Sequence, residues 1–166
     1  MSEGIVVLNE RSEWESIKDD VRRDKEVATF YLLQYDNELQ SYRDQRRADL
    51  GSIGDSAADL IRVAEYDRRH DAFYWLRAVG LVQAYCGAKR SLILNIRRSI
   101  QREALAGGQH AWVIKTQMRF IDEMYRNNKG DRTAYVSERQ VRACWADLVG
   151  RTIDIYLRLK IREKKR

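Results

Sequence analysis

The chain contains no proline in its 166 residues, and only nine glycines. Proline and glycine form most of the tight turns that β-rich proteins need, so a chain of this length without proline is hard to build from many short strands. Arg, Glu, Leu and Ala, which are strong helix formers, are abundant instead. We therefore expect an all-α fold.

The balance of apolar and charged residues narrows the class of protein. Hydrophobic residues make up 44% of the chain and charged residues 34%, which is enough to form a core and unusual for a disordered or membrane-embedded chain. No stretch approaches the ~20 apolar residues of a spanning helix, and the first ten residues lack the basic segment followed by an apolar one that marks a secretory signal. We expect a cytoplasmic protein with no membrane partner.

Motifs typical of metal sites and enzymes are missing from the sequence. Cys86 and Cys144 are far apart and belong to no Cys-x-x-Cys or Cys/His quartet, so we interpret them as ordinary semi-buried thiols. His70 lies near Asp67 and Asp71, but one imidazole among carboxylates on a charged helix is typical of a solvated face. Phosphate-binding loops, nucleophile elbows and His-Glu-x-x-His are also missing. We predict no metal, no cofactor and no enzymatic activity.

Apolar residues in the first third of the chain recur every three or four positions, the period of one helix face. After a loosely ordered start, a capping box at Ser12 and Glu15 predicts a short first helix. A long amphipathic helix is expected over residues 24–49. Its apolar stripe should pack against the next helix in an antiparallel hairpin, which we favour, or against a second copy of the chain. The stripe consists of Val27, Tyr31 or Leu32, Tyr35, Leu39 and Tyr42.

Glycine-containing breaks separate the later helices. The first of these helices, over residues 57–85, should bury Leu60 and expose its polar segment 65–71. Gly150 inside the last helix suggests a kink or close packing there. The remaining helices are expected over residues 88–105, over 110–126 and from the capping box Ser137–Gln140 onward. The predicted organisation is a loosely ordered segment over 1–25, a helical hairpin or bundle over 26–106, and a helix-turn-helix-like unit with a basic tail over 109–166.

Charge is distributed unevenly along the chain. Residues 97–166 contain 17 basic and 8 acidic side chains, whereas residues 1–96 contain 14 basic and 17 acidic ones. A concentrated basic surface attracts phosphate backbones and releases their counterions on binding. Double-stranded DNA is therefore the expected partner. The alternative is a solvated helical surface that happens to be basic.

The start of the last helix carries the predicted DNA contacts. A capped helix with long polar side chains in its first two turns resembles the recognition helix of a helix-turn-helix, whose N-terminal turns reach base edges. Its amides and nearby cations would contact phosphates. The alternative is a capped surface helix with no such role. The predicted DNA-binding residues are Lys115, Arg119, Lys129, Arg132, Ser137, Glu138, Arg139, Gln140 and Arg142.

The order of these segments also carries a family resemblance. A long amphipathic helix is followed by the break 51–56, a helix ending in residues 74–79, the apolar segment 92–97, and finally residues 136–141. This layout resembles the RinA/ArpU group of phage late-gene transcriptional activators, whose C-terminal part is similar to the DNA-reading domain 4 of sigma factors. The resemblance covers roughly residues 26–160. It implies that the helix from Ser137 recognises a phage late promoter in the cytoplasm of a bacterial host.

Taken together, the sequence predicts a DNA-binding transcriptional regulator that acts as a monomer or a homodimer. The resemblance leaves open whether RNA polymerase is also contacted. The alternative is a phage assembly protein that binds DNA, such as a small terminase subunit or a helical oligomeric adaptor, because long helices and basic contacts suit that role as well. A ring of eight or more subunits would favour the assembly protein.

Overall fold

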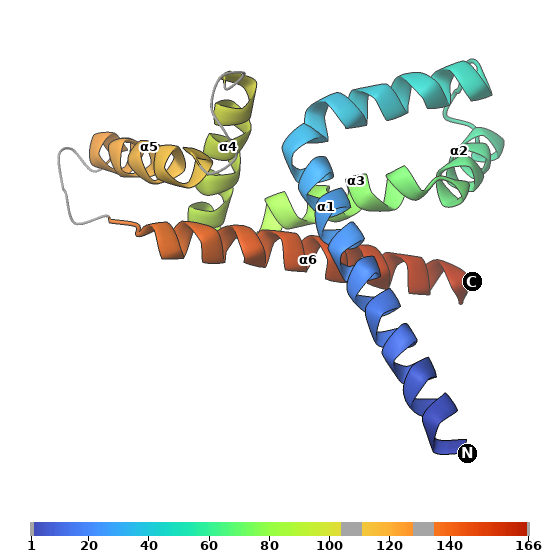
Figure 1. Ribbon diagram of the computed structural model, residues 1–166. Coiled ribbons are helices and arrows are strands. Elements are labelled where there is room, and N and C mark those ends of the chain that lie inside the picture. Colours follow the sequence, from blue (N-terminus) through green and yellow to red (C-terminus); the bar gives the residue numbers. More distant parts are fainter. Residues whose placement is uncertain (1, 104–110, 128–134, 166) are drawn as a thin grey trace.

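A computed structural model describes residues 2–103, 111–127 and 135–165, with side chains from residue 10 onward (Figure 1). Every regular element in these ranges is a helix, and the first is by far the longest, so the predicted all-α fold is confirmed. The helices are α1 (Ser2–Leu50), α2 (Ala57–Arg69), α3 (Asp71–Tyr85), α4 (Ala88–Glu103), α5 (Ala111–Asn127) and α6 (Glu138–Lys164).

Helix α1 extends further toward the N-terminus than the sequence suggested. A loosely ordered segment over residues 1–25 and a separate short helix from Ser12 were expected, but α1 runs unbroken through both regions from Ser2. Its regular geometry is interrupted at Gln34, where φ is −104° and ψ is 16°. The first half of α1 projects away from the rest of the chain (Figure 1). We call its residues 10–25 the arm; only Asp24 among them is partly covered.

The prediction of a single helix over residues 57–85 is wrong. His70 has an extended backbone, with φ −111° and ψ 116°, and separates α2 from α3. The polar segment before this break does not simply face solvent, because Asp67 is only 7% exposed. The Asp67 carboxylate accepts hydrogen bonds from Tyr42 at 2.7 Å and from Arg46 at 2.9 and 3.0 Å. Leu60, expected in the core, is 62% exposed.

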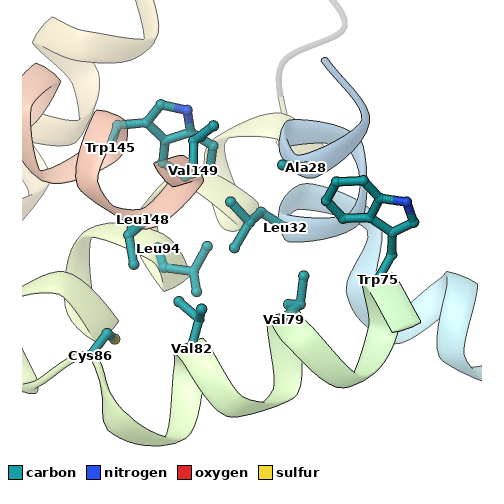
Figure 2. Close-up of a cluster of buried hydrophobic side chains, with 10 residues drawn as sticks. All are labelled: Ala28, Leu32, Trp75, Val79, Val82, Cys86, Leu94, Trp145, Leu148 and Val149. Carbon is teal, nitrogen blue, oxygen red and sulfur yellow. The ribbon is translucent and has the colours of Figure 1, made fainter. Parts of the chain in front are cut away.

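One core cluster joins α1, α3, α4 and α6. Figure 2 shows Leu32 pointing from α1 toward Val79 and Val82 of α3 and Leu94 of α4. The second half of α1 lies beside α3 and runs in the opposite direction (Figure 1), as the predicted hairpin requires. Burial of a side chain such as Leu32 contributes about 1.5–3 kcal/mol, so this packing holds α6 against the hairpin.

A stack of three aromatic rings joins α1, α3 and α6. Trp75 of α3 lies 3.7 Å from the ring of Tyr156 on α6 and 6.1 Å from that of Tyr31 on α1, measured between ring centroids. Asp71 accepts hydrogen bonds from the Tyr156 hydroxyl at 2.6 Å, from the Lys160 ammonium at 2.9 Å and from the Trp75 indole at 3.1 Å. The middle and end of α6 are therefore anchored on α3.

The second core cluster joins α4, α5 and the start of α6. Its buried residues are Ile93, Ile96, Ile100, Val113, Phe120, Val136 and Val141. Since α4 packs with α5, and α6 contributes to both clusters, the boundary predicted between residues 106 and 109 does not separate two cores. Gly150 lies inside α6, and the helix continues through this residue without a break. A Cβ atom at Gly150 would meet no atom within 4 Å, so the glycine serves no close packing.

Candidate nucleic-acid interface at the start of α6

The first turn of α6 is held by the predicted capping box, which is confirmed. The Ser137 hydroxyl accepts a hydrogen bond from the Gln140 amide at 3.1 Å, and the Gln140 side-chain oxygen accepts one from the Ser137 amide at 2.9 Å. The residue before the cap is fixed too, because the Gln117 side chain donates to the Val136 carbonyl at 3.0 Å. The Gln140 side-chain oxygen is thus occupied by the helix start.

Burial on one side of α6 determines which residues face outward. Val136 and Val141 are fully buried in the second cluster, whereas Glu138, Arg139 and Arg142 are exposed. Residues three apart on a helix lie on neighbouring positions of the same face, so Arg139 and Arg142 present their guanidinium groups together. The apolar contacts fix the helix, and the charged side chains remain free to contact a ligand.

A partly buried arginine lies behind this helix start. The guanidinium carbon of Arg97, on α4, lies 3.7 Å from the ring centroids of both Trp112 of α5 and Trp145 of α6. The two indoles themselves are 5.9 Å apart in an edge-on arrangement. Burial lowers the pKa of Arg97 to about 10, which leaves it charged at neutral pH. This cation–π sandwich links the three helices of the second cluster, and the sequence analysis did not identify it.

The cations of α6 differ in whether an acid compensates them. Those in the middle of the helix are paired: Arg151 lies 2.7 Å from Asp147, and Arg158 lies 3.0 Å from Asp154. Within the part of the chain that the structure describes, Arg139 and Arg142 have no ionic partner. The basic tail residues Arg162, Lys164 and Lys165 have none either. Uncompensated positive charge on α6 is therefore found at its two ends.

The predicted DNA contacts Lys115 and Arg119 lie on α5 near the Glu103 carboxylate, and their role in DNA binding stays a prediction. The Arg119 guanidinium donates to both carboxylate oxygens of Glu103 at the end of α4, one of them at 3.2 Å. This ion pair raises the pKa of Arg119 and lowers that of Glu103, and the exposed Lys115 lowers the Glu103 pKa further. Both cations thus lie beside an acid. The predicted contacts Lys129 and Arg132 are outside the described residues.

A further exposed cation was not among the predicted DNA contacts. Arg126, in the last turn of α5, is exposed and has no ionic partner among the residues that the structure describes. It lines a groove of about 490 Å³ between α4 and α5, together with Arg119, Asp122 and Glu123. Its position seven residues after Arg119 places it on the same helix face, a spacing that could have identified it.

The acidic residues and cysteines considered from the sequence as metal ligands have other surroundings in the structure. Asp67 and Asp71 form the hydrogen bonds already described, and the described ranges contain no group of three or more His, Cys, Asp or Glu side chains suited to a metal ion. Cys86 is buried and Cys144 is partly buried, and both are free thiols. Of the helices described, none combines the length and apolar character needed to cross a membrane.

Comparison of the chain with protein-family models, with curated proteins and with solved structures finds no match. Function therefore has to be inferred from the residues themselves.

Proposed function

We propose that the chain is a DNA-binding transcriptional regulator that inserts the start of α6 into the major groove. The observation that carries this proposal is the pair Arg139 and Arg142, exposed and without an acidic partner among the described residues, at the beginning of a helix whose other face is buried. An uncompensated pair of this kind contributes little to the fold, whereas it suits an anionic partner.

The chemistry of the α6 start fits a DNA duplex. An arginine can donate two hydrogen bonds to the O6 and N7 atoms of guanine, and Glu138 can accept one from the N4 amine of cytosine. The amides of the first turn and the positive end of the helix dipole favour a phosphate. Because the Gln140 oxygen is occupied by the capping box, Arg139, Arg142 and Glu138 are the residues best suited to base contacts.

The resemblance to the RinA/ArpU activators supports a more specific version of this proposal. In that version the regulator activates phage late genes in the cytoplasm of a bacterial host, and double-stranded DNA is its main partner. A contact with RNA polymerase would follow from the activator role. The activator role and the contact with RNA polymerase can each be tested separately from DNA binding.

One observation favours a second candidate, a DNA-binding phage assembly protein. The arm of α1 exposes several large apolar side chains, and such a surface is typical of a chain that associates with other copies. Assembly as a ring of eight or more subunits would favour this candidate, whereas a monomer or dimer would favour the regulator.

Selection of binding sites from a random DNA library tests the regulator proposal. Arg142→Ala should lose about 1–3 kcal/mol at the selected site and relax the preference at one base pair. Lys164→Ala, which removes an exposed tail cation, should weaken selected and scrambled duplexes alike. Circular dichroism should show that both variants remain helical. If no preferred site emerges from the library, the assembly protein replaces the regulator.

A further inference from the structure

The arm of α1 exposes an apolar stripe that no described part of the chain covers. Trp14, Ile17 and Val21 are 58%, 52% and 46% exposed, although each is a large hydrophobic residue. Their spacings of three and four put them on one helix face. Ala28, seven residues after Val21, continues the same face and is fully buried in the first core cluster. The face of α1 that packs into the first core cluster therefore continues along the arm, where it is exposed.

The described contacts of the arm are too weak to hold a helix in water. The ion pairs are all exposed and lie within the helix: Lys18 with Glu15 at 3.4 Å, Arg22 with Asp19 at 3.1 Å, and Arg23 with Asp20 at 3.6 Å. Pairs of this type contribute a few tenths of a kcal/mol each. Because an isolated helix of this length is marginal, most of its stability must come from packing of its apolar face.

The charges beside the stripe indicate what packs on it. If Trp14 and Val21 occupy the a positions of a heptad and Ile17 the d position, both g positions are acidic and both following e positions are basic. The g residues are Glu13 and Asp20, and the e residues are Lys18 and Lys25.

This pattern is complementary to itself in one orientation only. In a parallel pair of helices, g of one helix faces e of the next heptad on the other, which would bring Glu13 to Lys18 and Asp20 to Lys25 of the second copy. By symmetry each attraction occurs twice. An antiparallel pair would instead set e against e and g against g, which places like charges together.

We propose that the arm binds the arm of a second copy of this chain as a short parallel coiled coil. Glu10 and Asp24, at the flanking d positions, end the apolar stripe, so the seam is brief and the dimer dissociates reversibly. This pairing does not depend on DNA binding, and it leaves the start of α6 free on each copy.

Sedimentation of the full chain over a concentration series tests the pairing. The wild type should form a dimer, and Ile17→Asp should weaken dimerisation about tenfold or more, because it introduces a charge into the seam. Leu60→Asp is the matched control, since Leu60 is also an exposed large hydrophobic residue but lies on α2. A wild type that stays monomeric at every concentration, or an equal loss in both variants, would overturn the proposal. So would an assembly larger than a dimer.

Charge reversal tests the partner and its orientation. The variant Glu13→Lys/Asp20→Lys and the variant Lys18→Glu/Lys25→Glu should each be monomeric, and an equimolar mixture should form a heterodimer. Failure of the mixture to associate, with both variants helical by circular dichroism, would contradict self-pairing of the arms. In a separate Glu10→Cys variant, mild oxidation should form a disulfide between the two position-10 thiols, which only a parallel arrangement juxtaposes; no gain in cross-linking over the wild type would exclude that orientation.

Discussion

The Nε atom of Arg98 donates a hydrogen bond to the carbonyl oxygen of Leu32, 2.6 Å away and 66 residues earlier in the chain. In a regular helix this carbonyl accepts from the amide of residue 36, but the backbone leaves helical geometry at Gln34. A side-chain donor inserted into the helical hydrogen-bond ladder is an established cause of a kink. Arg98 thus contacts α1 next to its bend, and it also donates to Gln83 of α3 at 3.1 Å.

Removal of the Arg98 donors should destabilise the protein. Arg98→Met keeps much of the side-chain volume but leaves the Leu32 carbonyl without its charged donor, so we expect a loss of about 1.5–3 kcal/mol in the free energy of unfolding. Urea denaturation measures it. Arg102→Met, on the same helix but exposed and without a partner among the described residues, should stay within about 0.5 kcal/mol of the wild type. Similar values for the two variants would contradict the role given to Arg98.

The buried carboxylate of Asp67 should be equally sensitive. Asp67→Asn leaves Arg46 without its ionic partner, and breaking a fully buried pair costs about 3–5 kcal/mol. Because the Arg46 side chain is 26% exposed, we expect a smaller loss of roughly 2–3 kcal/mol, again by urea denaturation. The exposed neighbour Glu65, as Glu65→Gln, provides the comparison and should change stability little. A harmless Asp67→Asn would show that the carboxylate charge is not needed to join α1 to α2.

Two glycines should respond to alanine in opposite directions. Gly150→Ala, in the interior of α6 with free space around it, should stabilise the protein by about 1 kcal/mol, because alanine favours the helix. Gly51→Ala should destabilise it by about 1–2 kcal/mol, because Gly51 has a φ of +73° that alanine adopts with strain. Thermal or urea unfolding of the two variants compares them directly. A loss of stability in Gly150→Ala would mean that this position needs the freedom of glycine.

Stability should fall at alkaline pH through two tyrosines whose hydroxyls donate to carboxylates, Tyr42 to Asp67 and Tyr156 to Asp71. Burial, and then the hydrogen bond to Asp71, raise the pKa of Tyr156 above its ordinary value; the same two causes, with Asp67 as acceptor, raise that of Tyr42. The folded state therefore holds these protons more tightly than the unfolded chain does. Their contribution is complete below about pH 10 and is lost as the pH rises through the folded pKa values.

The urea midpoint at about pH 8 and about pH 11 measures this effect. Tyr156→Phe should lower stability at neutral pH but show a smaller further decline at alkaline pH than the wild type. Tyr85→Phe, which alters a side chain on the surface, should follow the wild type. An alkaline decline in Tyr156→Phe as steep as that of the wild type would contradict the linkage to this phenol.

Local sequence patterns predicted much of this fold because local chemistry determines those parts. The capping box at Ser137 and Gln140 and the periodicity of α4 and α6 depend on residues within a few positions of one another. The break at His70 was missed, and the contacts beside it are not local: Asp67 turns inward toward Tyr42 and Arg46, more than twenty residues earlier. No periodicity reveals such a contact.

In the candidate site, too, the features set by local sequence could be predicted and those set by distant contacts could not. The exposure of Arg139 and Arg142 follows from the burial of Val141 between them, which the helical period predicts. The pairing of Arg119 with Glu103, and the sandwich of Arg97 between two tryptophans, depend on how α4 crosses α5 and α6. Charge counts along a sequence cannot separate cations that are already paired from those that are free.

Fluorescence anisotropy of a labelled DNA duplex, titrated with the full chain across a salt series, tests most directly whether the start of α6 binds DNA. The wild type should bind at low salt, and its affinity should fall with a logarithmic slope of about −0.9 per phosphate contacted. Arg139→Ala/Arg142→Ala should weaken binding and reduce that slope by roughly two phosphate contacts, whereas Arg151→Ala/Arg158→Ala, which removes two paired cations of the same helix, should change little. No binding by the wild type at low salt, or equal losses in the two double variants, would contradict the proposed interface.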